Sequence, residues 1–380
     1  MALAAELWLA ALRAPLPGRV LRALAEQPAE AEATLGCGDS RRLRALGISE
    51  VAQRAVLEPD PDDLARDSEW LAQPGNRLIL WSDPDYPELL REAPSPPPAL
   101  CTSGDAHLLW RAQVAIVGSR NPTAGGADTA AAFAGHFARS GLLVTSGLAE
   151  GIDAAAHRAA LDSGEPTVAV VGTGPDRVYP ARHRALAEQI RSHGCIVSEF
   201  APGTAARAEH FPRRNRIIAA LSLGTLVVEA AQRSGALITA RNASESGREV
   251  FAIPGSIHNP LARGCHRLIR EGAALVETAD EVIEALRPGA QRLAGLLQQR
   301  LGEHAALPSA APACPASEAV TETDPERARL LKALGHDPVG IDQLAERTGL
   351  TVGVLSSMLL MLELEGVVSA RHGRYARRSS

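Results

Sequence analysis

Cysteine, lysine and aromatic residues are scarce in this chain of 380 residues. The five cysteines contain no Cys-x-x-Cys pair, which disfavours a disulfide framework and a zinc site and fits a reducing compartment. Lys332 is the only lysine, so nearly all of the positive charge is arginine, whose planar fork grips phosphate through two parallel hydrogen bonds. Aromatic residues make up 3% of the chain, which disfavours a long platform for stacking bases.

Long apolar runs are also missing. The chain has no apolar run of the length that crosses a bilayer, so we expect no membrane-spanning helix and no membrane partner. Residues 1–18 lack a basic start and are interrupted by Glu6, which favours a helix over a signal peptide and predicts a cytoplasmic protein. The net charge of −5 disfavours a protein that coats nucleic acid with its whole surface, so any nucleic-acid site must be a local basic cluster.

Four segments separate by composition. Residues 1–70 are typical of a small helical domain, either generic or of the SAM or helix-hairpin-helix kind. Residues 75–286 alternate short apolar runs with helical stretches, which predicts a Rossmann-like α/β domain with a parallel sheet covered on both faces. Residues 287–322 are rich in Pro, Ala, Gln and Ser and predict a linker. Residues 323–378 have the pattern of helix–turn–helix and β-wing, which predicts a winged helix.

Seven strands and four helices are expected in the central domain. The strands are Val114–Val117, Leu142–Thr145, Thr167–Val171, Cys195–Ser198, Thr225–Glu229, Glu249–Ile253 and Ala274–Val276. The helices are Ala127–Arg139, Gly151–Ser163, Arg182–Ser192 and Arg214–Leu221.

The loops after these strands are rich in small polar residues. In an open parallel sheet, ligands bind beyond the carboxyl ends of the strands, where N–H groups at helix N-termini favour an anion. One such loop is a weak signal, but five or six at one edge predict a phosphate-bearing ligand, the alternative being tight turns with no ligand. The loop residues expected to contribute are Gly118, Ser119, Ser146, Gly147, Ser234, Gly235 and Thr239.

A basic cluster narrows the choice of ligand. The arginines that fall within ten residues are Arg207, Arg213, Arg214 and Arg216. Because Ile217, Ile218 and Leu221 form the buried stripe of one helix, we expect Arg214 to reach toward the sheet edge.

The same spacing predicts that Asn215 and Arg216 point away from the core, on a helix that begins at Pro212. With Arg120 from the first loop, these side chains predict a positive groove rather than a solvated charged face. Glu199 and Glu229, at strand ends, are expected to anchor the arginines.

Three observations bear on an enzyme as the alternative. The first loop, Gly-Ser-Arg-Asn-Pro, breaks the Gly-x-Gly-x-x-Gly pattern of dinucleotide sites, and no Walker motif occurs. Asp153 and His157 are spaced as an acid–base pair, although such a pair more often orients a helix start. The run from Leu223 to Glu229 is similar to the signature of nucleotide-processing phosphoribohydrolases but lacks its Pro-Gly-Gly. We therefore expect no catalytic residue, metal or cofactor. Besides a nucleic-acid-binding protein and a nucleotide-processing enzyme, a winged-helix regulator with a ligand-sensing core is a third possibility.

Eight ordered motifs in residues 99–276 point to one family. They read GSRNPT, SGLAEGIDAAAH, VVGTGPDRVYP, SEFAPG, FPRRNRIIAALS, SGALITA, REVFAIPGS and GCHRLI. The chain resembles the DNA-processing protein A family, also called DprA or Smf. The plan of a helical N-terminal domain, a Rossmann-like core and a winged-helix tail is also similar to that of longer family members.

The resemblance implies that the chain binds and protects single-stranded DNA during natural transformation, helps load the RecA recombinase, and forms a homodimer through its Rossmann domain. It implies that the DNA pocket contains Arg120, Phe211, Arg213, Arg214 and Arg216. His266 stands where family members often have asparagine, and arginine stands where they often have lysine.

Phosphate contacts that ignore base identity predict salt-sensitive, sequence-tolerant binding, with stacking a minor contribution. In the tail, Arg371, Arg374, Arg377 and Arg378 are expected to meet phosphate. The reading helix, Thr351–Glu365, is poor in side chains that read bases, so duplex binding and protein docking stay equally open.

Overall fold

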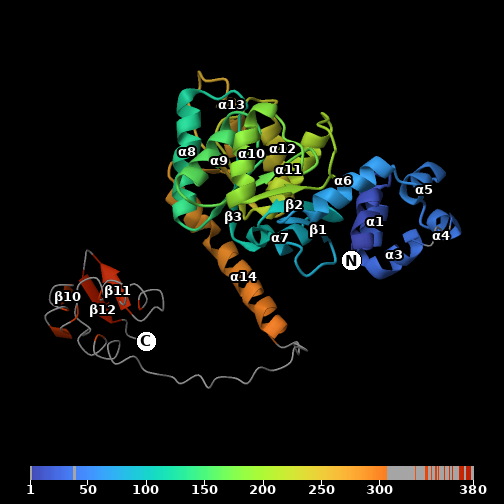
Figure 1. The fold of residues 1–380 in the computed structure, drawn as a ribbon. Coiled ribbons are helices and arrows are strands. Elements are labelled where there is room, and N and C mark those ends of the chain that lie inside the picture. The colour runs from blue at the N-terminus through green and yellow to red at the C-terminus, as the bar shows by residue number, and fades with distance from the viewer. Residues whose placement is uncertain are drawn as a thin grey trace. The chain divides into compact units, whose positions relative to one another are not determined.

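The computed structural model describes residues 2–36 and 40–305 and part of the C-terminal tail. The described tail residues are 330, 339–340, 344, 347–348, 350, 355, 359, 362, 368–371 and 374–377. The chain divides into two units, Met1–Leu307 and Pro308–Ser380 (Figure 1).

The first unit begins with six helices in its described part. They are α1 (Ala2–Arg13), α2 (Gly18–Glu26), α3 (Pro28–Gly36), α4 (Ser40–Ala45), α5 (Glu50–Leu57) and α6 (Pro61–Ala72). Ser49 caps α5 by accepting the N–H of Ala52, and Asp60 caps α6 by accepting that of Asp62. The apolar faces pack around Trp8, and Leu80 of the neighbouring sheet joins the same core. The small helical domain is therefore packed against the sheet (Figure 1).

A nine-stranded sheet forms the centre, in the order β1-β2-β6-β5-β4-β3-β7-β8-β9. The strands are β1 (Asn76–Leu80), β2 (Ala99–Gly104), β3 (Gln113–Val117), β4 (Leu143–Ser146), β5 (Thr167–Val170), β6 (Cys195–Ser198), β7 (Gly224–Val227), β8 (Glu249–Ala252) and β9 (Ala274–Leu275). Strands β3 to β9 are mutually parallel, whereas β2 is antiparallel to both β6 and β1. The chain moves outward from β3 to β6 and then returns to β7 beside β3, which makes the β3/β7 junction the topological switch point.

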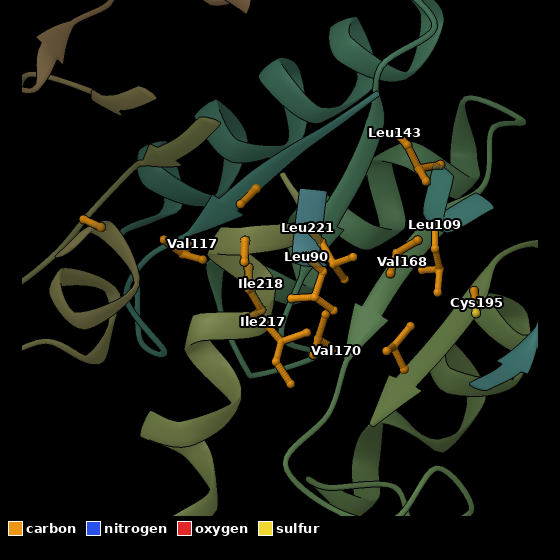
Figure 2. Close-up of a cluster of buried hydrophobic side chains, with 14 of the residues drawn as sticks. Leu90, Leu109, Val117, Leu143, Val168, Val170, Cys195, Ile217, Ile218 and Leu221 are labelled. Carbon is orange, nitrogen blue, oxygen red and sulfur yellow. The ribbon is translucent and has the colours of Figure 1, made fainter. Parts of the chain in front are cut away.

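Helices cover both faces of this sheet, as the sequence predicted. The helices are α7 (Glu88–Arg91), α8 (Ala124–Arg139), α9 (Ile152–Asp162), α10 (Arg184–His193), α11 (His210–Leu221), α12 (Gly235–Glu245), α13 (Arg263–Arg270) and α14 (Ala279–Ala305), with 3-10 turns at Ala106–Trp110 and Ala181–His183. Side chains of β3 alternate between the faces, so Val117 packs with α11 while Ile116 packs with α8 and α9. Figure 2 shows the first of these cores, where Ile217, Ile218 and Leu221 of α11 lie among strand residues.

Several elements differ from the prediction. Strands β1 and β2 were not predicted, and α11 begins at His210 instead of Pro212. The predicted start of the linker at residue 287 is wrong, because α14 continues to Ala305. Leu286 and Leu293, seven residues apart on one helical face, are buried against the sheet and hold this extension in place.

In the second unit, the described residues include a three-stranded antiparallel sheet in the order β10-β12-β11. The strands are β10 (Val339–Gly340), β11 (Val368–Arg371) and β12 (Arg374–Arg377). Leu355, Leu359 and Leu362 are buried at the spacing of one helical face. The strands fall where the wing was predicted, while Arg378 and residues 306–322 of the expected linker lie outside the described residues.

Candidate nucleic-acid interface

A small pocket lies where the carboxyl ends of β3, β4 and β5 meet the first turn of α11. Its volume is about 110 Å³. The pocket is lined by Arg120, Gly147, Ala149, Glu150, Tyr179, Pro180, Phe211 and Arg214. Arg120 and Arg214, which are far apart in sequence, thus lie at one site.

Arg214 forms the buried wall of this pocket and is 4% exposed. Its Nη1 donates to the carbonyl oxygens of Gly147, at 2.5 Å, and Val170, and its Nε donates to Oδ1 of Asn215 at 3.1 Å. Burial lowers the pKa of Arg214 to about 10, an effect that Asp153 opposes and Arg120 reinforces. The guanidinium therefore remains a cation at neutral pH, held by the ends of β4 and β5.

Asp153 and His157 do not pair with each other. Asp153 accepts the N–H groups of Gly147 and Ala149 and so fixes the β4–α9 loop. His157 lies next to Thr167 on the buried side of α9, with Nδ1 2.8 Å from its Oγ1. Asp153 orients the start of α9, whereas His157 connects the middle of α9 to β5, so both contacts are structural.

Aromatic rings form the open side of the pocket. The Phe211 ring lies 5.5 Å from that of Tyr179 at a tilt of 41°. The guanidinium of Arg120 lies over the same Phe211 ring at 5.5 Å, within the range of a cation–π contact. Tyr179 is 51% exposed, so its ring is available to a ligand. Tyr179 was absent from the predicted site, although it follows the third predicted strand and belongs to the motif VVGTGPDRVYP.

Glu199, at the end of β6, anchors two arginines, as expected. Its Oε2 is 3.0 Å from Nη2 of Arg213 and also contacts Nη2 of Arg216. Arg216 donates in addition to the carbonyl oxygen of Ser95. The predicted outward direction of Arg216 is therefore wrong, whereas Arg213 keeps half of its side chain exposed.

The predicted exposure of Asn215 is also wrong. Asn215 is 9% exposed, and its Nδ2 donates to the carbonyl oxygen of Gly235 at 3.3 Å. The cause is that α11 packs against α12 and α7 as well as the sheet, so it buries more than one stripe.

Glu229, unlike Glu199, does not anchor an arginine, so this prediction is wrong. Its carboxylate accepts the backbone N–H of Thr123 at 2.9 Å, the Thr123 hydroxyl at 2.8 Å and Nδ2 of Asn259 at 3.2 Å. Thr123 is the N-cap of α8, so a carboxylate of the chain itself lies at this helix start. Because α8 follows β3 and Glu229 follows β7, this contact closes the switch-point crevice.

The other predicted loop residues are distributed unevenly. Ser146 and Thr239 are buried, and the Ser146 hydroxyl donates to the carbonyl oxygen of Ile116. Ser234 caps α12, whereas Gly235 is exposed beside it. Gly118 and Ser119 are partly exposed and lead into Arg120. Only Arg120, Gly147, Phe211 and Arg214 of the predicted set line the pocket.

The described residues offer neither a metal site nor a membrane-spanning helix. No group of three or more His, Cys, Asp or Glu side chains there is arranged to hold a metal ion. Within the same residues, no helix has the length and apolar character needed to cross a membrane.

Comparison with known proteins gives consistent matches. The model of the family DNA recombination-mediator protein A matches residues 77–287, and a DprA winged helix domain model matches residues 314–374. The chain is 41% identical to Protein Smf of Escherichia coli (strain K12) over 309 residues, covering 81% of this chain and 79% of that protein. It is 46% identical to DNA processing protein DprA of Streptococcus pneumoniae over 201 residues, covering 53% and 71%.

Two solved structures are also similar. The X-ray structure of DNA processing protein A from Streptococcus pneumoniae gives a TM-score of 0.64 at 36% identity, covering 73% of this chain and 95% of that one. DNA processing protein A from Helicobacter pylori, studied for its single-stranded DNA binding mode, gives 0.50 at 27% identity, covering 53% and 93%. These matches confirm the α/β fold with a winged-helix tail. With the family model spanning the nine-stranded domain, they establish that the chain belongs to the DNA recombination-mediator protein A family.

Proposed function

We propose that this chain binds single-stranded DNA at the pocket between Arg120 and Arg214, protects incoming DNA during natural transformation and helps load RecA onto it. The observation that carries the proposal is the presence of two arginines, one from the loop after β3 and one from α11, in one pocket with two aromatic rings. Family membership supports the recombination role, and the Helicobacter pylori relative supports the choice of single-stranded DNA.

The two arginines are suited to one phosphate group. Arg120 is exposed, and among the residues that the structure describes no carboxylate forms an ion pair with it. Arg214 is buried and fixed, so it loses little conformational freedom when a phosphate approaches. An exposed cation at the rim and a buried one behind it together favour an anion that enters from solvent.

The aromatic pair supports a single strand over a duplex. Bases stack on aromatic rings only when they are unpaired, and each stacked base contributes roughly 1–3 kcal/mol. Tyr179 and Phe211 provide such a surface next to the arginines, so stacking has a larger share here than composition alone predicts. A pocket of about 110 Å³ is also far smaller than the roughly 300–1,000 Å³ of sites that enclose a small molecule. It suits part of a polymer that crosses the surface.

Among the predicted site residues, we assign the DNA contacts to those that line the pocket or are exposed next to it. Beyond the pocket, Arg213 is placed to meet a neighbouring phosphate, because half of its side chain is exposed. Apart from Arg214, the buried members of the predicted set support the loops; they are Ser146, Asn215 and Thr239. The homodimer through the Rossmann domain, the division into four segments and the cytoplasmic location belong to the same proposal.

The chain acts in this proposal without turnover. The switch-point crevice, where a Rossmann enzyme holds its nucleotide, is filled by the contact between Glu229 and Thr123. Incubation with nucleoside monophosphates is expected to leave them intact. Release of free base that scales with protein concentration would favour the phosphoribohydrolase-like alternative instead.

A salt titration of DNA affinity tests the proposal. Single-stranded oligonucleotides of unrelated sequence are expected to bind with similar affinity and more tightly than the matched duplexes. Arg120→Ala should weaken all of them and reduce the slope of log affinity against log salt by about 0.7 per lost phosphate contact. Arg287→Ala is the control, because Arg287 is an exposed arginine of α14 and its neighbour Leu286 lies against Gly224, at the amino end of β7. Equal affinity and slope for Arg120→Ala and the native chain would reject the proposal.

A further inference from the structure

The loop between β6 and α11 determines where the basic helix begins. It starts with Glu199, which binds Arg213 and Arg216, and leads to His210 and Phe211. The His210 ring stacks on that of Phe200 at 4.1 Å, so both ends of the loop are in contact. Any shift of this loop therefore moves the first turn of α11 and the pocket wall that it carries.

The N-terminal helices hold this loop through a buried ion pair. Arg13 at the end of α1 forms a two-pronged contact with Asp67 of α6, and its Nη2 lies 2.6 Å from Oδ1. The same Nη2 donates to the carbonyl oxygen of Pro202 at 2.7 Å. Asp67 is fully buried and Arg13 is 19% exposed, so the fork is rigid and shielded from solvent.

A second contact lies one residue further along the loop. Gly203 has φ of +80°, and a Cβ atom there would lie 2.7 Å from Nη1 of Arg66. On its other side, the Gly203 N–H donates to Oδ1 of Asp176 at 2.7 Å. The loop is thus held between α6 and the β5 loop that carries Tyr179.

Apolar packing supports the same junction. Leu9 of α1 and Trp70 of α6 share a buried cluster with Ala201 of the loop and Cys101 of β2. The N-terminal helices therefore reach the loop through one ion pair, one close backbone approach and one apolar cluster.

We infer that the N-terminal helical domain is a positioning element of the DNA site, acting through Arg13 and Asp67 on the loop that leads into Phe211 and Arg214. The inference rests on the proposed function. None of these N-terminal residues lines the pocket, so their contribution is to reduce the conformational freedom that the loop loses when DNA binds.

The test replaces the ion pair while keeping the packing. In Arg13→Met with Asp67→Leu, apolar side chains of similar volume fill the buried site, an exchange that often preserves or raises stability. We expect an unfolding midpoint equal to or above that of the native chain, together with roughly three- to tenfold weaker binding of a labelled oligothymidylate. The salt slope should not change, because no phosphate contact is removed. Amide hydrogen exchange in residues 200–210 should accelerate.

The matched control is Arg44→Gln with Glu50→Gln, which removes an exposed ion pair between α4 and α5 of the same helical domain and should leave affinity unchanged. If Arg13→Met with Asp67→Leu lowers the unfolding midpoint, the DNA affinity of Arg66→Ala tests the inference in its place. It leaves Arg13 and Asp67 in place and should still weaken binding about twofold at an unchanged slope. Native affinity in either stably folded variant overturns the inference. If the native chain binds no oligothymidylate, the proposed function is overturned. The amide exchange rates of residues 200–210 in the native and variant chains do not depend on DNA binding, so they still show whether the N-terminal helices hold the loop.

Discussion

The guanidinium of Arg214 occupies the space that any side chain at Gly147 would need. A Cβ atom on Gly147 would lie 2.5 Å from Nη1 of Arg214 and 2.6 Å from Cζ. The Gly147 carbonyl oxygen in turn accepts a hydrogen bond from the same Nη1. The position of the buried Arg214 charge therefore depends on the absence of a side chain at Gly147, just after β4.

Gly147→Ala is expected to weaken DNA binding about as much as Arg214→Ala, although it removes no charge. The methyl group would push the guanidinium out of its carbonyl cradle, and a displaced charge-assisted contact is worth about 1.5–3 kcal/mol. Oligonucleotide titrations of both variants measure the effect. Gly125→Ala is the control, because a Cβ there meets nothing within 4 Å. Native affinity for Gly147→Ala would show that the position of Arg214 is irrelevant to DNA.

Tyr179→Ala should lower the affinity for single-stranded DNA by about 1–3 kcal/mol, the contribution of one stacked base. Tyr179→Phe should bind like the native chain, because the ring and its contact with Phe211 are kept. The salt slope should be the same for all three proteins, since the change removes no cation. A loss of equal size in Tyr179→Phe would assign the effect to the hydroxyl group and contradict stacking.

Glu229→Ala is expected to reduce the free energy of unfolding by about 1.5–3 kcal/mol, the range for hydrogen bonds to a charged group. The substitution leaves the Thr123 N–H, the Thr123 hydroxyl and Asn259 without their carboxylate partner at the start of α8. Urea denaturation measures the loss. Glu209→Ala, which removes an exposed acid at the start of α11, should unfold like the native chain. Matching curves for both variants would mean that the Glu229 contacts contribute little.

His157 should make the protein less stable in mild acid. Burial lowers the pKa of His157 to about 3 from its ordinary value of 6.5, and the charges of His183 and Arg214 act in the same direction. Below about pH 6.5 the unfolded chain therefore takes up a proton that the folded chain does not bind. The free energy of unfolding consequently decreases as the pH is lowered from about 6.5. The loss from this residue reaches about 2 kcal/mol at about pH 5.

His157→Gln keeps a hydrogen-bond donor for the Thr167 hydroxyl but does not titrate. When the pH is lowered from about 7 to about 5, the free energy of unfolding should decrease less for this variant than for the native chain. The difference between the two decreases should be about 2 kcal/mol. Urea denaturation at several pH values gives both curves. Parallel curves would place the acid sensitivity elsewhere in the chain.

The parallel strands could be predicted because burial on both faces leaves continuous apolar, β-branched runs such as Val114–Val117. β2 was missed because Thr102 and Ser103 interrupt that pattern, although both are buried. The extension of α14 was missed because Pro288 and Gly289 resemble a helix end. Gly289 instead lies against Leu223, where a Cβ would come within 3.1 Å of the leucine side chain.

The candidate site was predictable where topology alone determines position. Arg120 lies three residues after the end of β3 and Arg214 lies near the start of α11 at the same edge, so the sheet order brings them together. Tyr179 lies in a long loop after β5, whose path depends on contacts such as that between Asp176 and Gly203. The partners of Glu199 and Glu229 depend on how helices pack in three dimensions, so one carboxylate matched its expected role and the other did not.

Glu229 has a consequence for competition among ligands. The start of α8 already holds a carboxylate from its own chain, and the N–H groups of Thr123 and Gly126 are bonded to Glu229 and to the Thr123 hydroxyl, so this helix start attracts a soluble mononucleotide or dinucleotide less strongly. The negative charge of Glu229 at the β3/β7 junction therefore disfavours binding of abundant anionic cofactors there, next to the arginines of the pocket. In a solution crowded with nucleotides, the edge of the sheet is left to a ligand long enough to reach Arg120 and Arg214 from outside.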